Sequence, residues 1–455
     1  MNVIFYLKKL KKNIKLIYKI LIKNFSKMSV AYKKRIIDEE LSMQMEVAWA
    51  IVVKWPKRCG KTTTCKQIAK SFVTLQDGNI NEEDNTIELA KIKPSIILQW
   101  KKPRLIDEWQ LAPNIWNAVR YSVDELWEKG QYLLTGSATP NEKESENLHS
   151  WIGRFAFLTM KTMSLYESWE SNWSVSLKDI VNWKKDIQWI NNISYEEMAF
   201  LICRWWRPDI FNIKSEKALL QISKNYITWL CESDISKIDG VSRNPELTRI
   251  ILQSYARLVS AIESNTTLIK DVKTRNIEVS EKTINEYLNI LKKLYVIEEI
   301  PAWNPNIRSK TSLRASPKKT FTDPSLATAA LWISPKELEK DIRTYWLLFE
   351  NLVDRDLSVY VNAIWWHLNH YRDRYGLECD QIAHFDNWKY GLIETKLGSQ
   401  AAINEAEEHL LKLQWLIKEN KELRAPDFMM IITNTKYAYT TENWILVVPI
   451  WCLKN

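Results

Sequence analysis

The amino-acid sequence predicts an α/β protein that begins with a parallel sheet flanked by helices. Residues 49–54 are a short apolar run typical of a buried strand, and after a polar loop the apolar residues take the spacing of a helix with one buried face. Two more short apolar runs end at 105–106 and at 131–134, with a helix that starts after Pro113 between them. Because strands that alternate with helices build βαβ units, this pattern predicts a parallel sheet.

The pattern changes twice after this core. Residues 166–240 are mainly helical, and 241–335 contain an amphipathic helix, with Ser280 as its N-cap, followed by a hairpin. We therefore predict an α/β core over 29–165, a helical linker, a winged-helix-like segment and a second α/β domain over 336–455. The elements expected in the last domain are a helix near 346–360, strands near 364–373, 377–385 and 389–396, and a helix near 401–418.

Composition excludes several classes of protein. Apolar residues make up 46% of the chain and charged residues 26%, as in globular proteins rather than disordered or fibrous ones. No run of about 18 apolar residues occurs, so we expect no transmembrane helix. The six cysteines are too scattered for a disulfide framework or for paired zinc-ligand spacing. This usage favours a reducing, cytoplasmic location.

The net charge of +9 comes almost entirely from the first 28 residues, which hold eight lysines and no acid. The rest of the chain is nearly neutral, so its overall charge does not indicate nucleic-acid binding. Apolar residues in this leader recur on one side of a helix, as in helices that lie on a membrane surface. The alternative is a start codon assigned too early, with Met28 as the true start.

Glycine is scarce and tryptophan abundant in this sequence. Nine glycines occur where a usage of roughly 7% predicts about 32, while tryptophan occurs 23 times. Trp388 and Trp444 each follow an asparagine in contexts where a turn favours Asn-Gly. We hypothesise that many tryptophans stand for glycines, encoded by UGA codons that some bacterial lineages read as glycine. The alternative is a tryptophan-rich surface that binds carbohydrate or aromatic ligands.

Residues 54–63 match the phosphate-loop pattern G-x-x-x-x-G-K-[ST], except that Trp55 replaces the first glycine. The loop follows a predicted strand and opens a helix, so its N–H groups are expected to face the phosphates of ATP. Lys61 would neutralise phosphate charge, and the Thr62 hydroxyl would help to hold Mg²⁺. The residues expected to contact the nucleotide are Trp55, Cys59, Gly60, Lys61, Thr62 and Thr63.

An acidic motif after the next strand completes this predicted site. Asp107 would lie beside Mg²⁺, and Glu108 would polarise the attacking water. The alternative is a pair of solvated acids that opens a helix. Ser137 follows a later strand and would contact the γ-phosphate. Arg154 would reach the nucleotide of a neighbouring subunit in a homo-oligomer, or would equally serve as a surface ion-pair partner.

Together with Met163-Ser164-Leu165-Tyr166-Glu167, these motifs resemble a prokaryotic family of AAA-type ATPases with a C-terminal domain of unknown function 4143. The resemblance covers about residues 30–455. It implies an AAA core, a winged-helix segment and a nuclease-like fold, with ATP and Mg²⁺ as ligands. Trp109 and Trp116 fit this family as tryptophans. The family tends to have glycine where this chain has tryptophan at 55, 151, 169, 173, 205, 388 and 451.

The hairpin region after the helix at 280–294 is basic. A helix followed by a basic hairpin is typical of a winged helix on a DNA backbone, and DNA is therefore an expected partner. The alternative is a solvated loop beside an ordinary packing helix. Between 301 and 320 no acid occurs, and the basic residues are Arg308, Lys310, Arg314, Lys318 and Lys319.

The last domain contains a pattern of the restriction-endonuclease-like nuclease fold. Asp380 in one predicted strand is followed by Glu394 and Lys396 in the next, where alternation puts the latter two on one face. The two carboxylates would hold Mg²⁺, Lys396 would orient or deprotonate water, and Glu350 would complete the acidic cluster. Charged strand residues that simply face solvent are the alternative. We expect Asp380, Glu394 and Lys396 to converge within a few ångströms.

Two functions follow from these motifs. The first is an enzyme that couples ATP hydrolysis to work on DNA or to its cutting. The second is a nucleotide-gated switch that binds DNA or a protein partner and contains an inactive nuclease-like domain.

Overall fold

A computed structural model describes residues 32–455, except 55–57, 77–79, 137–152, 183–186, 191–192, 238–239, 276–277, 307–314, 365, 374–375, 386–388 and 420–422. Arg35–Asn455 form one compact unit. The lysine-rich leader predicted over 1–28 lies outside the described residues. No helix in the described part of the chain is long and apolar enough to cross a membrane. All six cysteines are buried free thiols.

The first α/β core is a parallel five-stranded sheet with the order β2-β3-β4-β1-β5. Its strands are β1 (Ala50–Lys54), β2 (Ser71–Thr74), β3 (Arg104–Asp107), β4 (Tyr132–Gly136) and β5 (Phe155–Thr159). The elements around it are α2 (Ile37–Val47), α3 (Lys61–Ile68), α4 (Ile80–Ile92), α5 (Pro94–Ile97), η1 (Trp109–Leu111) and α6 (Asn114–Leu126).

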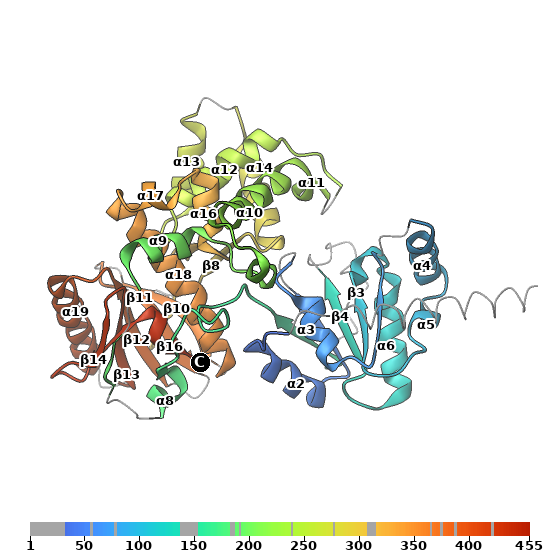
Figure 1. Ribbon diagram of the computed structural model, residues 1–455, viewed down its shortest axis with the longest axis horizontal. Coiled ribbons are helices and arrows are strands. Elements are labelled where there is room, and N and C mark those ends of the chain that lie inside the picture. Colours follow the sequence, from blue (N-terminus) through green and yellow to red (C-terminus); the bar gives the residue numbers. More distant parts are fainter. Residues whose placement is uncertain are drawn as a thin grey trace, which may run out of the picture. The chain divides into compact units, whose positions relative to one another are not determined.

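Helices cover both faces of this sheet (Figure 1). Val52, Ile106 and Leu134 share a core with residues of α6, whereas Val53 and Leu133 share a core with residues of α2 and α3. The continuous apolar strands follow from this burial, because a parallel sheet with helices on both faces needs apolar side chains on both. The predicted parallel sheet with flanking helices is confirmed.

The middle of the chain is mainly helical, as expected. Ser280 caps α14 through its hydroxyl, which accepts a hydrogen bond from the backbone N–H of Thr283 at 3.0 Å. Most of the described helices of this region precede an antiparallel pair of strands, β8 (Ile297–Ile300) and β9 (Lys318–Phe321), and the last two follow it. The helices are α9 (Tyr195–Cys203), α10 (Glu216–Trp229), α11 (Ile235–Lys237), α12 (Pro245–Arg257), α13 (Asn265–Lys273), α14 (Glu281–Lys293), α16 (Pro324–Leu331) and α17 (Pro335–Leu338).

Two lysines of the predicted basic hairpin lie on β9 but do not face solvent. Lys318 and Lys319 are buried, at 1% and 0% exposure. The Lys318 ammonium contacts the carboxylates of Glu350 and Asp354 in the following domain, and Lys319 donates to Asn265 at 2.8 Å. The prediction that these two lysines are exposed to DNA is wrong, because both are buried: carboxylates distant in sequence neutralise Lys318, and Lys319 lies 4.0 Å from Glu299 on the paired strand. Arg308, Lys310 and Arg314 lie outside the described residues.

The last domain is a mixed seven-stranded sheet with the order β10-β11-β12-β13-β15-β14-β7. Helix α18 (Ile342–Ala363) shares a core with one face, and α19 (Gln400–Glu419) shares a core with the other. The strands are β10 (Trp366–Arg372), β11 (Glu378–Phe385), β12 (Tyr390–Lys396), β13 (Phe428–Thr433), β14 (Tyr437–Thr440), β15 (Leu446–Pro449) and β7 (Trp189–Ile190). Short elements are β6 (Val175–Ser176), α8 (Leu177–Val181), η3 (Pro208–Asn212), η4 (Leu230–Asp234), η5 (Ile450–Cys452) and β16 (Leu453–Lys454).

Several tryptophans occupy backbone positions that favour glycine. Among the described residues, nine residues other than glycine have a left-handed φ, and five of them are tryptophans with φ between 49° and 69°. Two of the five follow the last residues of α6 and α16, where glycine commonly ends a helix. All five side chains are exposed, by 51% to 82%. These tryptophans are Trp127, Trp169, Trp173, Trp332 and Trp444.

The predicted glycine positions divide into three groups. Trp169, Trp173 and Trp444 have the left-handed φ that a glycine would favour. Trp205 and Trp451 are buried in the core and have no left-handed φ. The others, Trp55, Trp151 and Trp388, lie outside the described residues.

Candidate nucleotide and acidic sites

The phosphate loop joins β1 to the start of α3. Gly60 has a φ of 103° and directly precedes the helix, a conformation that residues with a side chain rarely adopt. A Cβ atom at this position would also lie 3.2 Å from Pro208. Lys61 is the first helical residue and is 6% exposed. The first turn of α3 therefore presents its N–H groups and a lysine at one point, an arrangement suited to an anion.

Asp107, at the end of β3, connects this strand to β4 and to helix α3. Its Oδ1 atom accepts hydrogen bonds from the Thr62 hydroxyl at 2.8 Å and from the Thr135 hydroxyl at 2.5 Å. The strand order explains this meeting, because β4 lies between β1 and β3 and all three are parallel. A hydroxyl and a carboxylate are the hard oxygen ligands that Mg²⁺ prefers, so Thr62 and Asp107 fit this ion.

Glu108 follows Asp107 with a left-handed φ of 57°. Its carboxylate accepts a hydrogen bond from the side-chain amide of Gln110. Gly136, at the end of β4, leaves room for this pair, since a Cβ atom there would lie 2.5 Å from Gln110 Oε1. Gln110 thus holds the Glu108 side chain, which directly follows Asp107 in the sequence. Ser137, expected to touch the γ-phosphate, lies outside the described residues.

The other residues predicted for the nucleotide site differ from one another in exposure and in contacts. Cys59 is buried, Thr63 is exposed, and Trp55 lies outside the described residues. Arg154 forms an ion pair with Asp124 at 2.5 Å, and both side chains are partly exposed. Arg154 thus has the surface ion-pair partner that was the alternative to a role at a neighbouring subunit.

A second charged cluster lies on strands β11 and β12. Lys396 Nζ lies 2.8 Å from Glu394 Oε2 and 3.8 Å from Asp380 Oδ2. Gln381 pairs with Ile393 across the two strands, which places Asp380 opposite Glu394. The structure therefore brings Asp380, Glu394 and Lys396 together.

Glu350 reaches this cluster from α18 through a buried lysine. The Lys318 ammonium lies 2.5 Å from Glu350 and 2.9 Å from Asp354, and it donates to the backbone carbonyl of Asp380 at 3.1 Å. Each carboxylate thus has a cation beside it. In the described residues, no group of three or more His, Cys, Asp or Glu side chains is arranged to hold a metal ion.

The side chains of this cluster change one another's pKa values. Burial, and then the carboxylate of Glu394, raises the pKa of Asp380 to about 7. Burial alone would raise the pKa of Glu394, but a hydrogen bond with His409 and the charge of Lys396 hold that pKa below its ordinary value. His409 Nδ1 lies 3.2 Å from Glu394, and this hydrogen bond raises the pKa of His409.

Residues 49–169 match the family model of an AAA domain. The first part of the chain has an AAA-type P-loop fold. The model of a domain of unknown function designated DUF8612, rather than domain of unknown function 4143, matches residues 197–337. Two uncharacterised proteins, from Mycobacterium bovis and Mycobacterium tuberculosis, are each 23% identical to the chain over 312 residues. These residues are 67% of this chain, but the match spans only 61% of the length of each relative.

Solved structures are similar only at a coarse level. The Walker-type ATPase of Pyrococcus abyssi is 11% identical with a TM-score of 0.39, over 65% of this chain and 94% of that chain. The ORC1 protein of Aeropyrum pernix in complex with DNA is 12% identical with a TM-score of 0.26, over 67% of this chain and 94% of that chain. The AAA assignment therefore rests on the family match and on the geometry of the phosphate loop.

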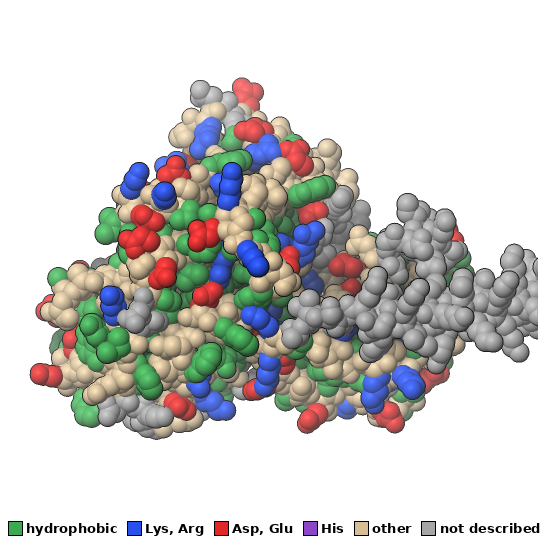
Figure 2. Space-filling view, viewed as in Figure 1, with side chains coloured by type: hydrophobic (Ala, Val, Ile, Leu, Met, Phe, Trp, Pro, Cys, Tyr) green, Lys and Arg blue, Asp and Glu red, His purple; other side chains and the backbone are tan. Residues whose placement is uncertain are grey.

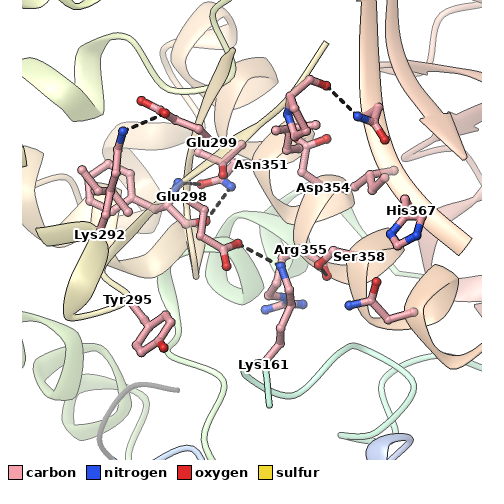
Figure 3. Close-up of a pocket in the computed structure, with 18 of the residues that line it drawn as sticks. Lys161, Lys292, Tyr295, Glu298, Glu299, Asn351, Asp354, Arg355, Ser358 and His367 are labelled. Atoms are coloured by element: carbon pink, nitrogen blue, oxygen red, sulfur yellow. Dashed lines mark hydrogen bonds and ion pairs between the residues drawn. The ribbon is translucent and has the colours of Figure 1, made fainter. Parts of the chain in front are cut away.

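A cavity of about 650 Å³, which no described residue of the phosphate loop lines, lies near Lys161, Glu298 and Asp354 (Figure 3). Residues of β8, α18 and β10 line it, including Asp354, which also contacts Lys318. Ion pairs occupy its wall, because Lys161 lies 2.9 Å from Glu298 and Lys292 lies 2.7 Å from Glu299. The opposite charges facing this cavity already neutralise one another.

Sequence reasoning missed three residues that complete these sites. Thr135 donates to Asp107, His409 binds Glu394, and Arg35 donates to the phosphate-loop carbonyl of Cys59. The position of Thr135 at a strand end was a usable signal, because it directly precedes Gly136 and Ser137. His409 and Arg35 had no such signal, since each approaches its site from a helix or loop outside the motifs.

Proposed function

We propose that this protein binds ATP with Mg²⁺ and hydrolyses it. The observation that carries the proposal is the meeting of Thr62 and Asp107 at the start of α3, next to Lys61. Residues of the phosphate loop and of the acidic motif, which lie 45 positions apart in the sequence, meet here and would bind phosphate and Mg²⁺ together. The match of residues 49–169 to an AAA domain supports the same function.

Each residue has a role that its position supports. Lys61 and the first N–H groups of α3 bind the phosphates, while Thr62 and Asp107 hold Mg²⁺. Bound Mg²⁺ supplies positive charge that stabilises the charge developing on the phosphate oxygens. Glu108 accepts a hydrogen bond from the attacking water and polarises it, a role available to a carboxylate beside the metal-binding acid. Ser137 contacts the γ-phosphate in this proposal.

We propose further that the last domain is nuclease-like and acts on DNA. Asp380 and Glu394 would hold Mg²⁺, with Glu350 nearby, and Lys396 would stabilise charge on the phosphorane. The support is the ion pairing of Lys396 with both carboxylates on adjacent strands. Incubation of the protein with DNA and Mn²⁺ tests this. Cleavage that disappears in Lys396→Ala supports a nuclease, and no cleavage with or without ATP contradicts one.

A second candidate is a nucleotide-gated switch with an inactive nuclease-like domain. The observation that favours it is that a lysine already pairs with each cluster carboxylate: Lys396 with Glu394 and Asp380, and Lys318 with Glu350. An ATPase assay with and without DNA separates the two candidates. Stimulation by DNA supports work on nucleic acid, whereas tight ATP binding with negligible turnover supports the switch.

DNA contact belongs to the winged-helix-like segment in this proposal. Helices α12, α13 and α14 followed by the β8–β9 hairpin have the order of elements of a winged helix. On the face drawn in Figure 2, basic and acidic side chains are interspersed over the surface. DNA contact on this face would therefore depend on individual side chains rather than on one broad basic area.

We also propose a cytoplasmic location and, for Arg154, a role in a homo-oligomer. Six buried free thiols are compatible with a reducing compartment. A role for Arg154 at a neighbour's nucleotide requires its ion pair with Asp124 to open. Sedimentation with and without ATP tests the oligomer, since ATP should increase the assembled fraction if Arg154 reaches across.

A further inference from the structure

A buried arginine outside the nucleotide motifs holds the phosphate loop. Arg35 lies before α2 and is 3% exposed. Its guanidinium donates to the backbone carbonyl of Cys59 at 2.9 Å and to the carbonyl of Lys161 at 2.8 Å. The same side chain forms an ion pair with Glu167 at 2.9 Å. Arg35 therefore joins the phosphate loop to the segment that follows the AAA sheet.

The bond to Cys59 determines the direction of the next N–H group. In a planar trans peptide the carbonyl and the N–H point in opposite directions. Because the Cys59 carbonyl points to Arg35, the N–H of Gly60 points away from Arg35. Gly60 precedes the first turn of α3, so this orientation aligns its N–H with the site where phosphates are expected to bind.

Glu167 fixes the arginine in this position. Its side chain is 3% exposed and accepts hydrogen bonds from the backbone N–H of Ile36 at 2.8 Å and of Ser164 at 2.9 Å. A buried ion pair often contributes little net stability compared with apolar residues of similar size. Its geometric effect is more specific, because the planar guanidinium directs several hydrogen bonds at fixed angles.

The segment around Glu167 is itself attached to the last domain. The N–H of Leu165 donates to Asp356 on α18 at 2.9 Å, and the Arg355 guanidinium donates to the same carboxyl group at 2.8 Å. Helix α18, which also carries Glu350 and Asp354, therefore binds the segment that contains Glu167, the partner of Arg35.

We propose that Arg35 and Glu167 are positioning residues for ATP, which orient the Gly60 N–H and thereby set the affinity for the nucleotide phosphates. This inference rests on the proposed ATP binding. Arg35 does not touch the reacting atoms, so its loss should change affinity more than chemistry. A lysine at 35 keeps the positive charge but lacks the planar fork that directs the three contacts of Arg35, so it should restore binding only in part.

The test compares Arg35→Gln and Arg35→Lys with the parent by the dissociation constant for ATP and by KM and kcat. Arg204→Gln is the matched control, because Arg204 forms a similar ion pair with Glu170 at 2.7 Å and contacts no phosphate-loop residue that the structure describes. We expect Arg35→Gln to raise the dissociation constant and KM at least about tenfold. Its kcat at saturating ATP should change less than about threefold. The dissociation constant and KM of Arg35→Lys should lie between those of the parent and of Arg35→Gln.

Thermal unfolding without nucleotide separates positioning from loss of stability. Equal destabilisation in Arg35→Gln and Arg204→Gln, with weaker ATP binding only in the former, supports the proposal. Two results overturn the proposal without affecting the proposed ATPase function. The first is an unchanged ATP affinity in folded Arg35→Gln. The second is a loss of affinity in Arg204→Gln equal to that in Arg35→Gln. A parent protein that binds no ATP, even with glycine at position 55, overturns both. If Arg35→Gln fails to fold, the same measurements are made on Glu167→Gln. Weaker ATP binding than in Arg204→Gln then supports the proposal, and unchanged ATP affinity overturns it.

Discussion

At the scale of single residues, the tryptophans with a left-handed φ indicate positions where glycine would be the more stable residue. A residue with a Cβ atom is less stable in this conformation than glycine by about 1–2 kcal/mol. An exposed indole gains little burial in exchange, and Trp127 is 82% exposed and Trp332 is 60% exposed. By contrast, Trp109 and Trp116 are buried and stack on each other at 4.5 Å. The backbone thus distinguishes candidate glycines from structural tryptophans.

We predict that Trp127→Gly and Trp332→Gly each raise the free energy of unfolding by about 0.5–1 kcal/mol, after the greater flexibility of glycine in the unfolded chain offsets part of the gain. Trp116→Gly, which empties a packed site, should lower it by about 3–5 kcal/mol. Urea denaturation measures all three. Destabilisation by the first two variants would contradict the glycine hypothesis, and so would UGG codons at these positions in the gene.

The sequence predicts contacts between site residues only where a local pattern brings the residues together. The meeting of Thr62 with Asp107 follows from local spacing, because Thr62 lies on the helix that follows β1, and Asp107 ends β3 of the same parallel sheet. Lys318 was expected in solvent because its neighbours in sequence are basic, but its partners Glu350 and Asp354 lie more than 30 positions later. Compensation of a buried charge across domains has no local pattern.

At the scale of elements, Lys318 connects β9 to α18. Its removal by Lys318→Met should leave two buried carboxylates without their cation and lower the free energy of unfolding by about 3–5 kcal/mol. Lys336→Met removes an exposed lysine and should change it by less than about 0.5 kcal/mol. Chemical denaturation measures both. Equal stabilities of the two variants would show that the buried contacts do not neutralise Glu350 and Asp354.

Strand β10 contains a histidine that should make stability depend on pH. Burial, and then the charge of Lys318, lowers the pKa of His370 to about 4. His370 Nε2 lies 3.1 Å from the backbone oxygen of Ser316, and Arg372 is a further nearby cation that lowers this pKa. The unfolded chain, with an ordinary pKa of about 6.5, takes up a proton first as pH falls. Stability is therefore complete above about pH 6.5 and is lost toward pH 4.

Between pH 7.5 and pH 5, we expect the parent to lose about 2 kcal/mol more of its free energy of unfolding than His370→Gln does. Glutamine keeps a donor for the Ser316 carbonyl without the titration. His367→Gln, which removes an exposed histidine from the same strand, is the control. Urea titrations at the two pH values give the difference. The same pH dependence in His370→Gln as in the parent would contradict this burial effect.

The element pattern itself was largely predictable. Expected and observed bounds of β11, β12 and α19 agree within one residue at each end, because their apolar periodicity is strong. Strand order and the pairing of α18 with the AAA segment were not predictable, since contacts such as Leu165 with Asp356 join residues far apart in sequence.

At the scale of the whole molecule, side-chain contacts connect the proposed nucleotide site in the AAA domain to the charged cluster in the last domain. The connecting contacts run from the phosphate loop through Arg35 and Glu167 to α18. ATP binding and the state of the second cluster are therefore expected to influence each other, and DNA stimulation of ATP turnover is the observable sign of it.

The proposed ATP hydrolysis is tested most directly by the ATP turnover of Glu108→Gln, measured against a parent with glycine at position 55. Glutamine keeps the shape of the side chain but cannot act as the base that activates water. The variant should bind ATP as tightly as the parent and hydrolyse it at least about a hundredfold more slowly. Lys61→Ala, the control for binding, should lose both properties. Equal turnover in Glu108→Gln and its parent would contradict the assignment of this site.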